Sequence, residues 1–242
     1  MAGAGSFLLE KDGRVATLIF NRPEKRNPLN EEIVLEFERL LHQVRDDRDV
    51  RVLIVTGSGN TFSAGADLST LKEVTDPEER QRLFAPLSKR RSRLIGRALG
   101  VLANLEVLTI AAVNGYAIGG GWGIALGCDI RIAVAGAQFW FPEVDLGVPL
   151  SPEATTLLAA QSGPAIAKEV IITCRRYTAE ELVPMGLVNR VVKKEELYPT
   201  VREMARAIAA KNPVAVMGVK ATVNAVSSGG RALRLDLLLD RG

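Results

Sequence analysis

The fold is decided by residues 107–128, which read VLTIAAVNGYAIGGGWGIALGC in the middle of a 242-residue chain. These twenty-two residues carry no charge. Their β-branched side chains stand at the front, and Asn114 and six glycines are spread over the remainder. A membrane span would need an apolar run that stays helical throughout. The order found here predicts instead a buried strand, a tight turn and a closely packed helix.

The alternation of strand and helix extends outward in both directions. Short apolar or alternating runs predict strands, and apolar stripes with helical spacing predict helices. We expect strands at 7–9, 15–20, 50–56, 108–113, 130–134, 138–141 and 187–192, and helices after Asn30, after Asp76 and at 122–126, 152–161, 164–173, 179–185, 195–210 and 213–226. The last third is mostly helical. The whole pattern predicts an α/β fold with right-handed crossovers and a helical C-terminal part.

The composition limits the chemistry that the chain can perform. Hydrophobic residues make up 47% and charged residues 24%, so a sizeable core can form without disulfides. His42 is the only histidine, and Cys128 and Cys174 are the only cysteines. A histidine-rich metal site is therefore excluded, and no zinc site is expected. Acid-base chemistry near neutral pH falls to carboxylates with raised pKa values, and we expect His42 at the boundary of the core.

The charge balance is mildly basic, with a net charge of +3 and a pI of about 9.0. This balance fits a small anionic ligand and does not require nucleic acid. Residues 1–7 contain neither a basic stretch nor an apolar one, so no signal peptide is predicted. We expect a cytoplasmic protein that does not enter a membrane.

Three glycine-rich turns follow predicted strands. The first, residues 57–62, has Phe62 where a dinucleotide fingerprint needs its third glycine, and no Gly-Lys-Ser/Thr follows, which excludes a P-loop. The second, residues 63–68, and the third, residues 119–123, leave backbone N–H groups open, and the third begins a helix. Together they could donate two N–H groups to one enolate or tetrahedral oxyanion, or they could serve only close packing against the sheet.

One carboxylate lies in a strongly apolar stretch, because Glu143 stands in FWFPEVDLGVP at residues 139–149. If this side chain is buried, its pKa rises and it can shuttle protons near neutral pH. The alternative is an ordinary glutamate that faces solvent at the end of a strand. Asp145 follows two residues later, so both carboxylates would face one side of an extended stretch, and Asp145 is a further candidate.

Taken as an ordered set, these motifs resemble the crotonase family, the enoyl-CoA hydratase/isomerase superfamily. The resemblance covers nearly the whole chain. The matching segments are NRPEKRN at 21–27, FSAGADL at 62–68, AAVNGYAIGGG at 111–121, CDI at 128–130, PE at 142–143 with LG at 146–147, TAEE at 178–181 and GLVN at 186–189.

The resemblance implies a fold, an assembly and a substrate. It implies a spiral of ββα turns in residues 1–190 and a helical trimerisation part in residues 191–242, the two forming one continuous unit. It also implies homotrimers, often paired into hexamers. The implied substrate is a coenzyme A thioester, and no further cofactor or metal is expected.

The resemblance also implies roles for individual residues. The backbone N–H groups of Ala64 and Gly120 would bind the thioester oxygen, and Asp67 would cap its segment rather than react. A run of arginines would add charge near the phosphates or form a solvated helix face; these are Arg90, Arg91 and Arg93. The residues expected to contact the substrate and its coenzyme A are Lys25, Arg26, Ala64, Gly65, Ala66, Asp67, Leu68 and Gly120.

The chain departs from the hydratases of this family at one catalytic position. Those enzymes carry a glutamate just after the triple glycine and another at Pro-Glu, whereas here the two positions are Gly123 and Glu143. A single base cannot add water in the usual two-carboxylate way, but it can remove a proton beside a thioester and return it elsewhere, as Δ3,Δ2-enoyl-CoA isomerases do. Other relatives place an acid at the position of Ser151, and Glu153 would replace it only if this loop differs in length.

We therefore predict an acyl-CoA enzyme of the hydratase/isomerase type, in fatty acid or related metabolism. It would stabilise a thioester enolate in a backbone oxyanion hole, with Glu143 as acid and base. The alternatives are a lyase, hydrolase or decarboxylase of coenzyme A thioesters, or a non-catalytic member that binds acyl-CoA. An RNA-binding member that uses the basic run 89–93 is a further alternative, although nucleic acid is the less expected partner.

Overall fold

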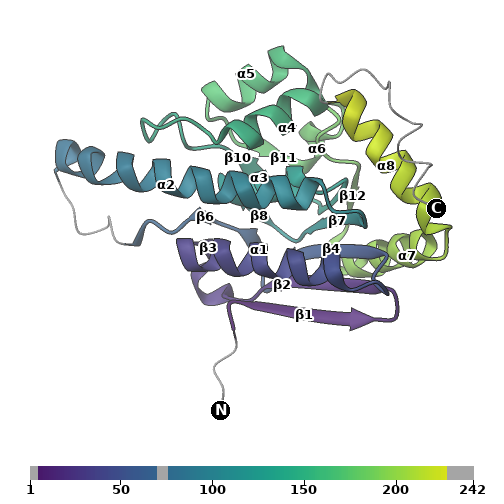
Figure 1. Cartoon of the computed structure of the whole chain (residues 1–242). Helices are drawn as coiled ribbons and strands as arrows, with labels where there is room; N and C mark the ends of the chain where they lie inside the picture. The colour runs from purple at the N-terminus through teal and green to yellow at the C-terminus, as the bar shows by residue number, and fades with distance from the viewer. Residues whose placement is uncertain (1–4, 70–75, 228–242) are drawn as a thin grey trace.

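The computed structural model describes residues 5–69 and 76–227, and within them the chain makes three successive ββα turns (Figure 1). In each turn the first strand joins one sheet and the second strand joins another. The turns are β4(Val52–Gly57), β5(Thr61–Ser63) and α2(Pro77–Ala103), then β7(Leu108–Val113), β8(Tyr116–Ile118) and α3(Gly120–Gly127), then β9(Ile130–Val134), β10(Gln138–Trp140) and α4(Pro152–Ser162). The expected α/β class and the spiral of ββα turns are confirmed.

The larger sheet has six strands in the order β1-β2-β4-β7-β9-β12. β1(Phe7–Asp12) and β2(Val15–Phe20) form an antiparallel hairpin, and each further strand, ending with β12(Arg190–Val192), is parallel to its neighbour. Every residue of β4 is buried, as expected for a parallel strand that is covered on both faces. One of the covering helices is α7(Leu197–Ala209), which packs against β2, β4, β7 and β9.

The shorter strands build two further sheets that the sequence patterns did not indicate. A four-stranded sheet has the order β11-β10-β8-β5, with β11(Tyr177–Thr178) at its edge, and β3(Pro28–Leu29) pairs with β6(Gly65–Ala66). Of these strands only β10 was expected. Two or three residues are too few to show an alternation of apolar and polar side chains, so the sequence predicts the residues of β8 only as part of a turn.

The first helix forms where the sequence predicts it. In α1(Glu31–Asp46) the side chain of Asn30 caps the start by accepting the Ile33 N–H at 2.8 Å. Two ion pairs join α2 to α1, Arg90 with Glu31 at 2.9 Å and Arg97 with Glu38 at 2.8 Å. The predicted apolar stripe of α1 is buried throughout, at Ile33, Val34, Phe37, Leu40, Leu41 and Val44.

The C-terminal part adds α5(Pro164–Ile172), α6(Ala179–Leu182) and α8(Pro213–Ser227) to the core. No helix in the described ranges is long and apolar enough to cross a membrane. Four valines of α8 are exposed, Val214, Val219, Val223 and Val226.

A buried polar cluster ties α8 to the central sheet. Lys220, whose side chain is 5% exposed, places Nζ 2.8 Å from Asp129 Oδ2 and donates to the Val107 carbonyl at 2.9 Å. The same carboxylate oxygen accepts the Thr109 N–H at 2.7 Å and the Thr109 hydroxyl at 2.8 Å. Arg131 is buried next to this cluster, and desolvation lowers its pKa to about 10.

Candidate active site

A cavity of about 80 Å³ lies where β6, the start of α3 and the loop after β10 meet α2. It brings together five residues that the sequence singled out, which are Ala66, Arg91, Gly120, Glu143 and Ser151. Among the lining residues, all of which belong to the described part of the chain, Glu143 is the only acid. The full lining is Leu29, Val34, Ala66, Ser88, Arg91, Ser92, Ile95, Leu99, Gly120, Glu143, Leu150, Ser151 and Ala154.

Asn27 fixes the segment that forms one wall of this cavity. Its side chain is almost fully buried, accepts the Arg22 N–H at 2.9 Å and donates to the Thr61 carbonyl at 2.7 Å. Arg26 and Asn27 both have positive φ angles, 63° and 52°, a conformation that costs energy in residues other than glycine. The hydrogen bonds of Asn27 offset that cost and hold the loop before β3 against the strand β5. The sequence matched Asn27 to a motif without indicating this role.

The two alanines of this wall differ in what their N–H groups do. Ala64 donates its N–H to the Arg26 carbonyl at 2.9 Å, so that group is used within the chain. Ala66 is the register partner of Leu29, and the N–H of Asp67 bonds to the Leu29 carbonyl. Because N–H groups alternate sides along a strand, that of Ala66 points away from Leu29. Ala66 lines the cavity, and Ala64, the expected donor, does not.

The start of α3 forms the opposite wall. Gly119 has a φ of +50°, and a Cβ at that position would lie 2.7 Å from Glu143 Oε1, so only glycine fits. The first helical bond runs from the Gly123 N–H to the Gly119 carbonyl. The N–H of Gly120 therefore precedes the hydrogen bonds of α3, at the positive end of the helix dipole.

Glu143 has the environment that its apolar sequence neighbours predict. Burial raises the pKa of its carboxyl to about 7, against a smaller opposing effect of a backbone hydrogen bond. Oε2 is buried, and no group in the described part of the chain bonds to it. A carboxyl with such a pKa exchanges protons readily at neutral pH.

The other two candidate carboxylates lie outside this cavity. Asp145 is exposed, because hydrogen bonds such as Val148 N–H to the Glu143 carbonyl close a tight turn here. The extended stretch that would have set Asp145 beside Glu143 is therefore absent from residues 142–148. Glu153 lies in the first turn of α4, with its carboxylate packed against Gly96 of α2.

The positions at which relatives carry a second acid hold no acid here. Ser151 caps α4 by accepting the Ala154 N–H at 3.2 Å. Gly123 is buried, and a Cβ there would lie 3.4 Å from Leu99 and 3.5 Å from Ala154, both ordinary contacts. The space beside Gly123 is thus apolar and admits a small side chain.

Of the residues expected to contact the substrate and its coenzyme A, Ala66 and Gly120 line the cavity and the others do not. Lys25 and Arg26 are exposed at the end of a short helical turn, η1(Pro23–Lys25), and do not line the cavity. Gly65 has a φ of +72° and packs directly against the Ile118 carbonyl, where a side chain would clash. Leu68 packs against Val148.

Asp67 orders its own segment, as the sequence predicts. Its Oδ1 accepts the Ser69 N–H at 3.0 Å. Partial burial acts to raise the pKa of Asp67, but the hydrogen bonds from Ser69 and the positive charges of Arg22 and Arg91 outweigh it. The pKa of Asp67 therefore lies below its usual value.

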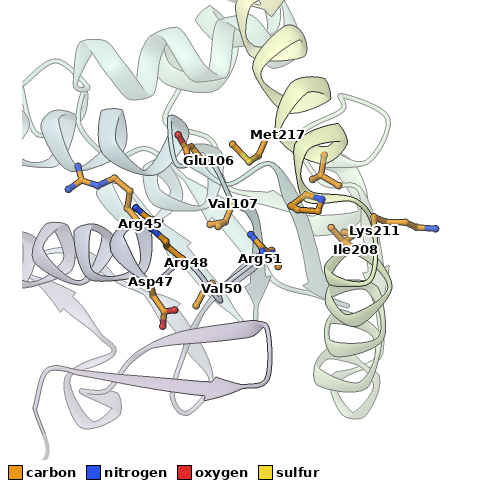
Figure 2. Close-up of a pocket in the computed structure, with 12 residues that line it drawn as sticks. Arg45, Asp47, Arg48, Val50, Arg51, Glu106, Val107, Ile208, Lys211 and Met217 are labelled. Atoms are coloured by element: carbon orange, nitrogen blue, oxygen red, sulfur yellow. The ribbon is translucent and has the colours of Figure 1, made fainter. Parts of the chain in front are cut away.

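Other cavities lack this combination of groups. One of about 470 Å³ lies before the starts of β4 and β7, and Figure 2 shows Arg45 and Lys211 pointing away from each other at its two sides. Its Asp47 is paired with Lys11 at 2.7 Å. An apolar groove of about 860 Å³ lies between α2, α4 and α8. In the described ranges, no three His, Cys, Asp or Glu side chains gather as a metal site.

Known proteins resemble this chain over most of its length. The family model described as Enoyl-CoA hydratase/isomerase matches residues 10–237. A crotonyl-CoA hydratase of Syntrophomonas wolfei is 40% identical over 220 residues, which make up 90% of this chain and 81% of that protein. A short-chain-enoyl-CoA hydratase of Clostridium acetobutylicum is 38% identical over 226 residues, 90% of this chain and 80% of that protein. The crystal structure of an enoyl-CoA hydratase from Bacillus anthracis has a TM-score of 0.81 at 30% identity, covering 97% of this chain and 87% of that one.

Proposed function

The chain belongs to the enoyl-CoA hydratase/isomerase family, and for this acyl-CoA enzyme we propose a reaction in which Glu143 moves a proton along the acyl chain of an enoyl-CoA. The observation that carries the proposal is the carboxyl of Glu143. It is the only acid in the described lining of the cavity, and its pKa is raised to about 7. One carboxyl of this kind suits a reaction in which a single group first takes a proton and then returns it.

The thioester oxygen would lie between the N–H groups of Ala66 and Gly120. Both residues line the cavity with Glu143, and neither N–H is required by the neighbouring strand β3 or by the helical bonds of α3. Ala66 replaces Ala64 in this role because the N–H of Ala64 is bonded to Arg26. Two fixed donors stabilise the negative charge that develops on the oxygen as the enolate forms.

The proton transfers balance with Glu143 alone. Ionised Glu143 takes a proton from C2 of a 3-enoyl thioester, and the electron pair of that C–H bond moves into the enolate. Protonated Glu143 then gives the proton to C4, and the double bond comes to lie between C2 and C3. The enzyme returns to its starting ionisation state, and no other reactant is consumed.

Hydration is the second candidate, because the proteins from Clostridium acetobutylicum, Syntrophomonas wolfei and Bacillus anthracis are all named hydratases. With Gly123 in place of a second glutamate, Glu143 would have to activate the water and also protonate the enolate. Lyase, hydrolase and decarboxylase reactions could use the same oxyanion donors, and their products differ from those of an isomerase. Arg90 in the basic run is paired with Glu31, which leaves less free charge for RNA.

The test is a turnover screen with crotonyl-CoA, a 3-enoyl-CoA and feruloyl-CoA, comparing the protein with its Glu143→Gln variant by chromatography and mass spectrometry. We expect a product of unchanged mass and shifted retention from the 3-enoyl-CoA, lost in the variant. A Glu143-dependent gain of 18 mass units, the mass of one water, would favour hydration in place of isomerisation. Full activity of the Glu143→Gln variant would contradict both.

We also propose that copies of the chain associate as trimers or hexamers in the cytoplasm. Three exposed valines of α8, Val219, Val223 and Val226, support the association, because they lie on one face of the helix and apolar side chains clustered in this way favour burial against another chain. Light scattering on the purified protein, compared with a Val219→Lys variant, checks this. A wild-type monomer at micromolar concentration would contradict it.

A further inference from the structure

Arg91 lines the cavity, whereas the other two arginines of the basic run, Arg90 and Arg93, do not. Arg90 is paired with Glu31 on α1, and Arg93 is exposed. Arg91 lines the cavity together with Gly120 and Glu143. Its Nε and Nη1 atoms are buried, and neither has a hydrogen-bond partner within residues 5–69 and 76–227. The residue as a whole is half-buried, and the expected contact with the phosphates stays a prediction.

A guanidinium in this position calls for an anionic partner. Arginine stays charged at any physiological pH, so it cannot avoid the cost of burial by losing its proton. Buried charges in proteins are normally paired, because an unpaired one loses its hydration without compensation. The planar guanidinium with its fork of donors matches a carboxylate or a phosphate in two parallel hydrogen bonds.

No acid in the described residues forms an ion pair with the guanidinium of Arg91. No ion pair within 4.0 Å joins Arg91 to an acid in the described part of the chain, although its charge reaches Asp67 and helps to lower the pKa of that residue. Glu143 shares the cavity, yet burial is the leading effect on its pKa, which is raised rather than lowered. A cation close to the Glu143 carboxyl would have the opposite effect. The guanidinium is therefore separate from the proton-transfer centre.

The spacing along α2 places Arg91 near the acyl group. A Cβ on Gly120 would meet Ile95 at 3.6 Å, so Ile95 marks the level of the thioester. Arg91 is one turn away on the same helix, about 6 Å along its axis. The arm of coenzyme A between the sulfur and the first phosphate is far longer, roughly 15 Å when extended at backbone-like bond lengths. An anion a few bonds from the thioester carbonyl fits this separation better than a phosphate does.

We propose that Arg91 selects acyl-CoA substrates that carry a second carboxylate at the far end of a short acyl chain. The inference rests on the proposed function, since it takes the cavity of Glu143 and Gly120 to hold the thioester. Within that cavity Arg91 would bind the distal carboxylate, orient the acyl chain along α2 and disfavour chains that end in a methyl group. The substrate class is thus a short dicarboxylic enoyl-CoA.

The experiment compares two thioesters that differ by one carboxylate, crotonyl-CoA and 4-carboxycrotonyl-CoA. For the wild-type protein we expect a higher kcat/KM on the carboxylated substrate. In the Arg91→Met variant that preference, the ratio of the two kcat/KM values, should fall by about 10- to 100-fold. Arg91→Lys should keep part of the preference, and Arg93→Met, on the same helix but exposed, should keep all of it.

A phosphate partner gives a different result. If Arg91 binds coenzyme A itself, Arg91→Met lowers kcat/KM on both substrates alike. The same substitution then has no effect on the matching N-acetylcysteamine thioesters, which have no phosphates. This outcome would overturn the proposal, as would a wild-type preference for crotonyl-CoA that Arg91→Met leaves unchanged.

Binding measurements separate this proposal from the proposed function. Calorimetry with the saturated analogues glutaryl-CoA and butyryl-CoA needs no turnover. If glutaryl-CoA binds more tightly than butyryl-CoA and Arg91→Met abolishes the difference, the carboxylate-binding role of Arg91 is supported. If at the same time no enoyl-CoA is converted, only the proposed function fails. Glu143-dependent turnover with no difference between the two analogues would overturn the role of Arg91 alone.

Discussion

Glu143 and Asp129 are two acids at the edge of the same core, and their surroundings are opposite. Three donors reach Oδ2 of Asp129, two from Thr109 and one from Lys220. Oε2 of Glu143 is buried, and no group in the described part of the chain bonds to it. Asp129 lies beneath α8, whereas Glu143 lines the cavity with Gly120. The largely buried carboxylate of Asp129 therefore has three donors on one oxygen, whereas one oxygen of Glu143 has none in the described residues.

This difference suits Asp129 to stabilising the fold and Glu143 to exchanging a proton. A carboxylate fully bonded by fixed donors gains little from changing its protonation state. Burial makes a carboxyl group hold its proton more tightly than it would in water, and a pKa raised to near 7 lets it exchange that proton at neutral pH. Substitution of Glu143 should therefore affect mainly turnover, and substitution of the partners of Asp129 should affect mainly the free energy of unfolding.

The largest expected effect is on turnover in Glu143→Gln. The amide cannot take a proton, so kcat should fall by about 10²–10⁴-fold, the usual contribution of a general acid or base. Steady-state kinetics on the best acyl-CoA substrate measures this loss. Asp145→Asn, two residues away and exposed, is the matched control and should keep full activity. Equal losses of kcat in Glu143→Gln and Asp145→Asn would contradict a specific role of Glu143 in proton transfer.

The next largest effect is on stability in Lys220→Met. This substitution leaves Asp129 buried without its cation, which costs about 3–5 kcal/mol of unfolding free energy in comparable sites. Urea unfolding measures the loss, and the Lys220→Met/Asp129→Asn double variant should recover part of it, since both charges are then gone. A loss below 1 kcal/mol, or no recovery in the double variant, would show that the pair does not hold α8.

A third effect is a gain in stability in Glu143→Gln that depends on pH. The folded protein raises the pKa of Glu143 from 4.5 to about 7, so it binds this proton more tightly than the unfolded chain does. Stability from this group is complete below about pH 4.5 and is lost as the pH rises through 7. The variant avoids the loss and should be more stable than wild type by up to about 3 kcal/mol at pH 8, and similar to it at pH 4. Thermal melts across this range check the sign, and a variant less stable at pH 8 than at pH 4, relative to wild type, would contradict it.

The same pKa predicts the pH dependence of catalysis. The ionised carboxylate is the form that removes a proton, so kcat/KM should rise with pH and level off above about 7. Below that value the rate should fall about tenfold per pH unit. A rate profile that is flat between pH 5 and 8 would exclude Glu143 as the base.

The smallest effect is expected in Thr109→Val. The substitution removes the hydroxyl that donates to the Asp129 carboxylate and accepts the Asp129 N–H at 2.9 Å. It keeps the shape of the side chain, the Thr109 N–H, Lys220 and the bond from the Asp129 N–H to the Thr109 carbonyl. A hydrogen bond to a charged group contributes about 1.5–3 kcal/mol, and the remaining donors reduce its loss to the lower end of that range. Urea unfolding measures it, with activity per folded molecule unchanged. If Thr109→Val lost more unfolding free energy than Lys220→Met, the hydroxyl would contribute more than the cation to stabilising Asp129.

Sequence patterns predicted the long strands and the apolar surroundings of Glu143. The strands at 108–113 and 130–134 were placed to the residue, because each is a run of apolar side chains that ends at a turn. The raised pKa of Glu143 followed from its apolar neighbours. Strands of two or three residues, such as β6 and β8, carry no periodicity, and their pairing depends on partners elsewhere in the chain.

The finer features of the site depend on geometry that a sequence does not encode locally. Whether Ala64 or Ala66 faces the cavity is set by the register of β6 on β3, which Asn27 fixes from about forty residues away. Arg90, Arg91 and Arg93 look alike as a basic run. Successive residues of a helix differ by about 100° in direction, so the rotation of α2 decides that Arg91 enters the cavity.

The bond between Lys220 and Asp129 has a consequence for synthesis on the ribosome. Asp129 meets Thr109 early in translation, but Lys220 follows about ninety residues later, some 5–20 s at typical elongation rates. During that interval the central strands have no α8 to cover them and no cation for Asp129. The nascent chain should therefore remain open to chaperones until its last quarter emerges, and the enzyme should become protease-resistant in one late step.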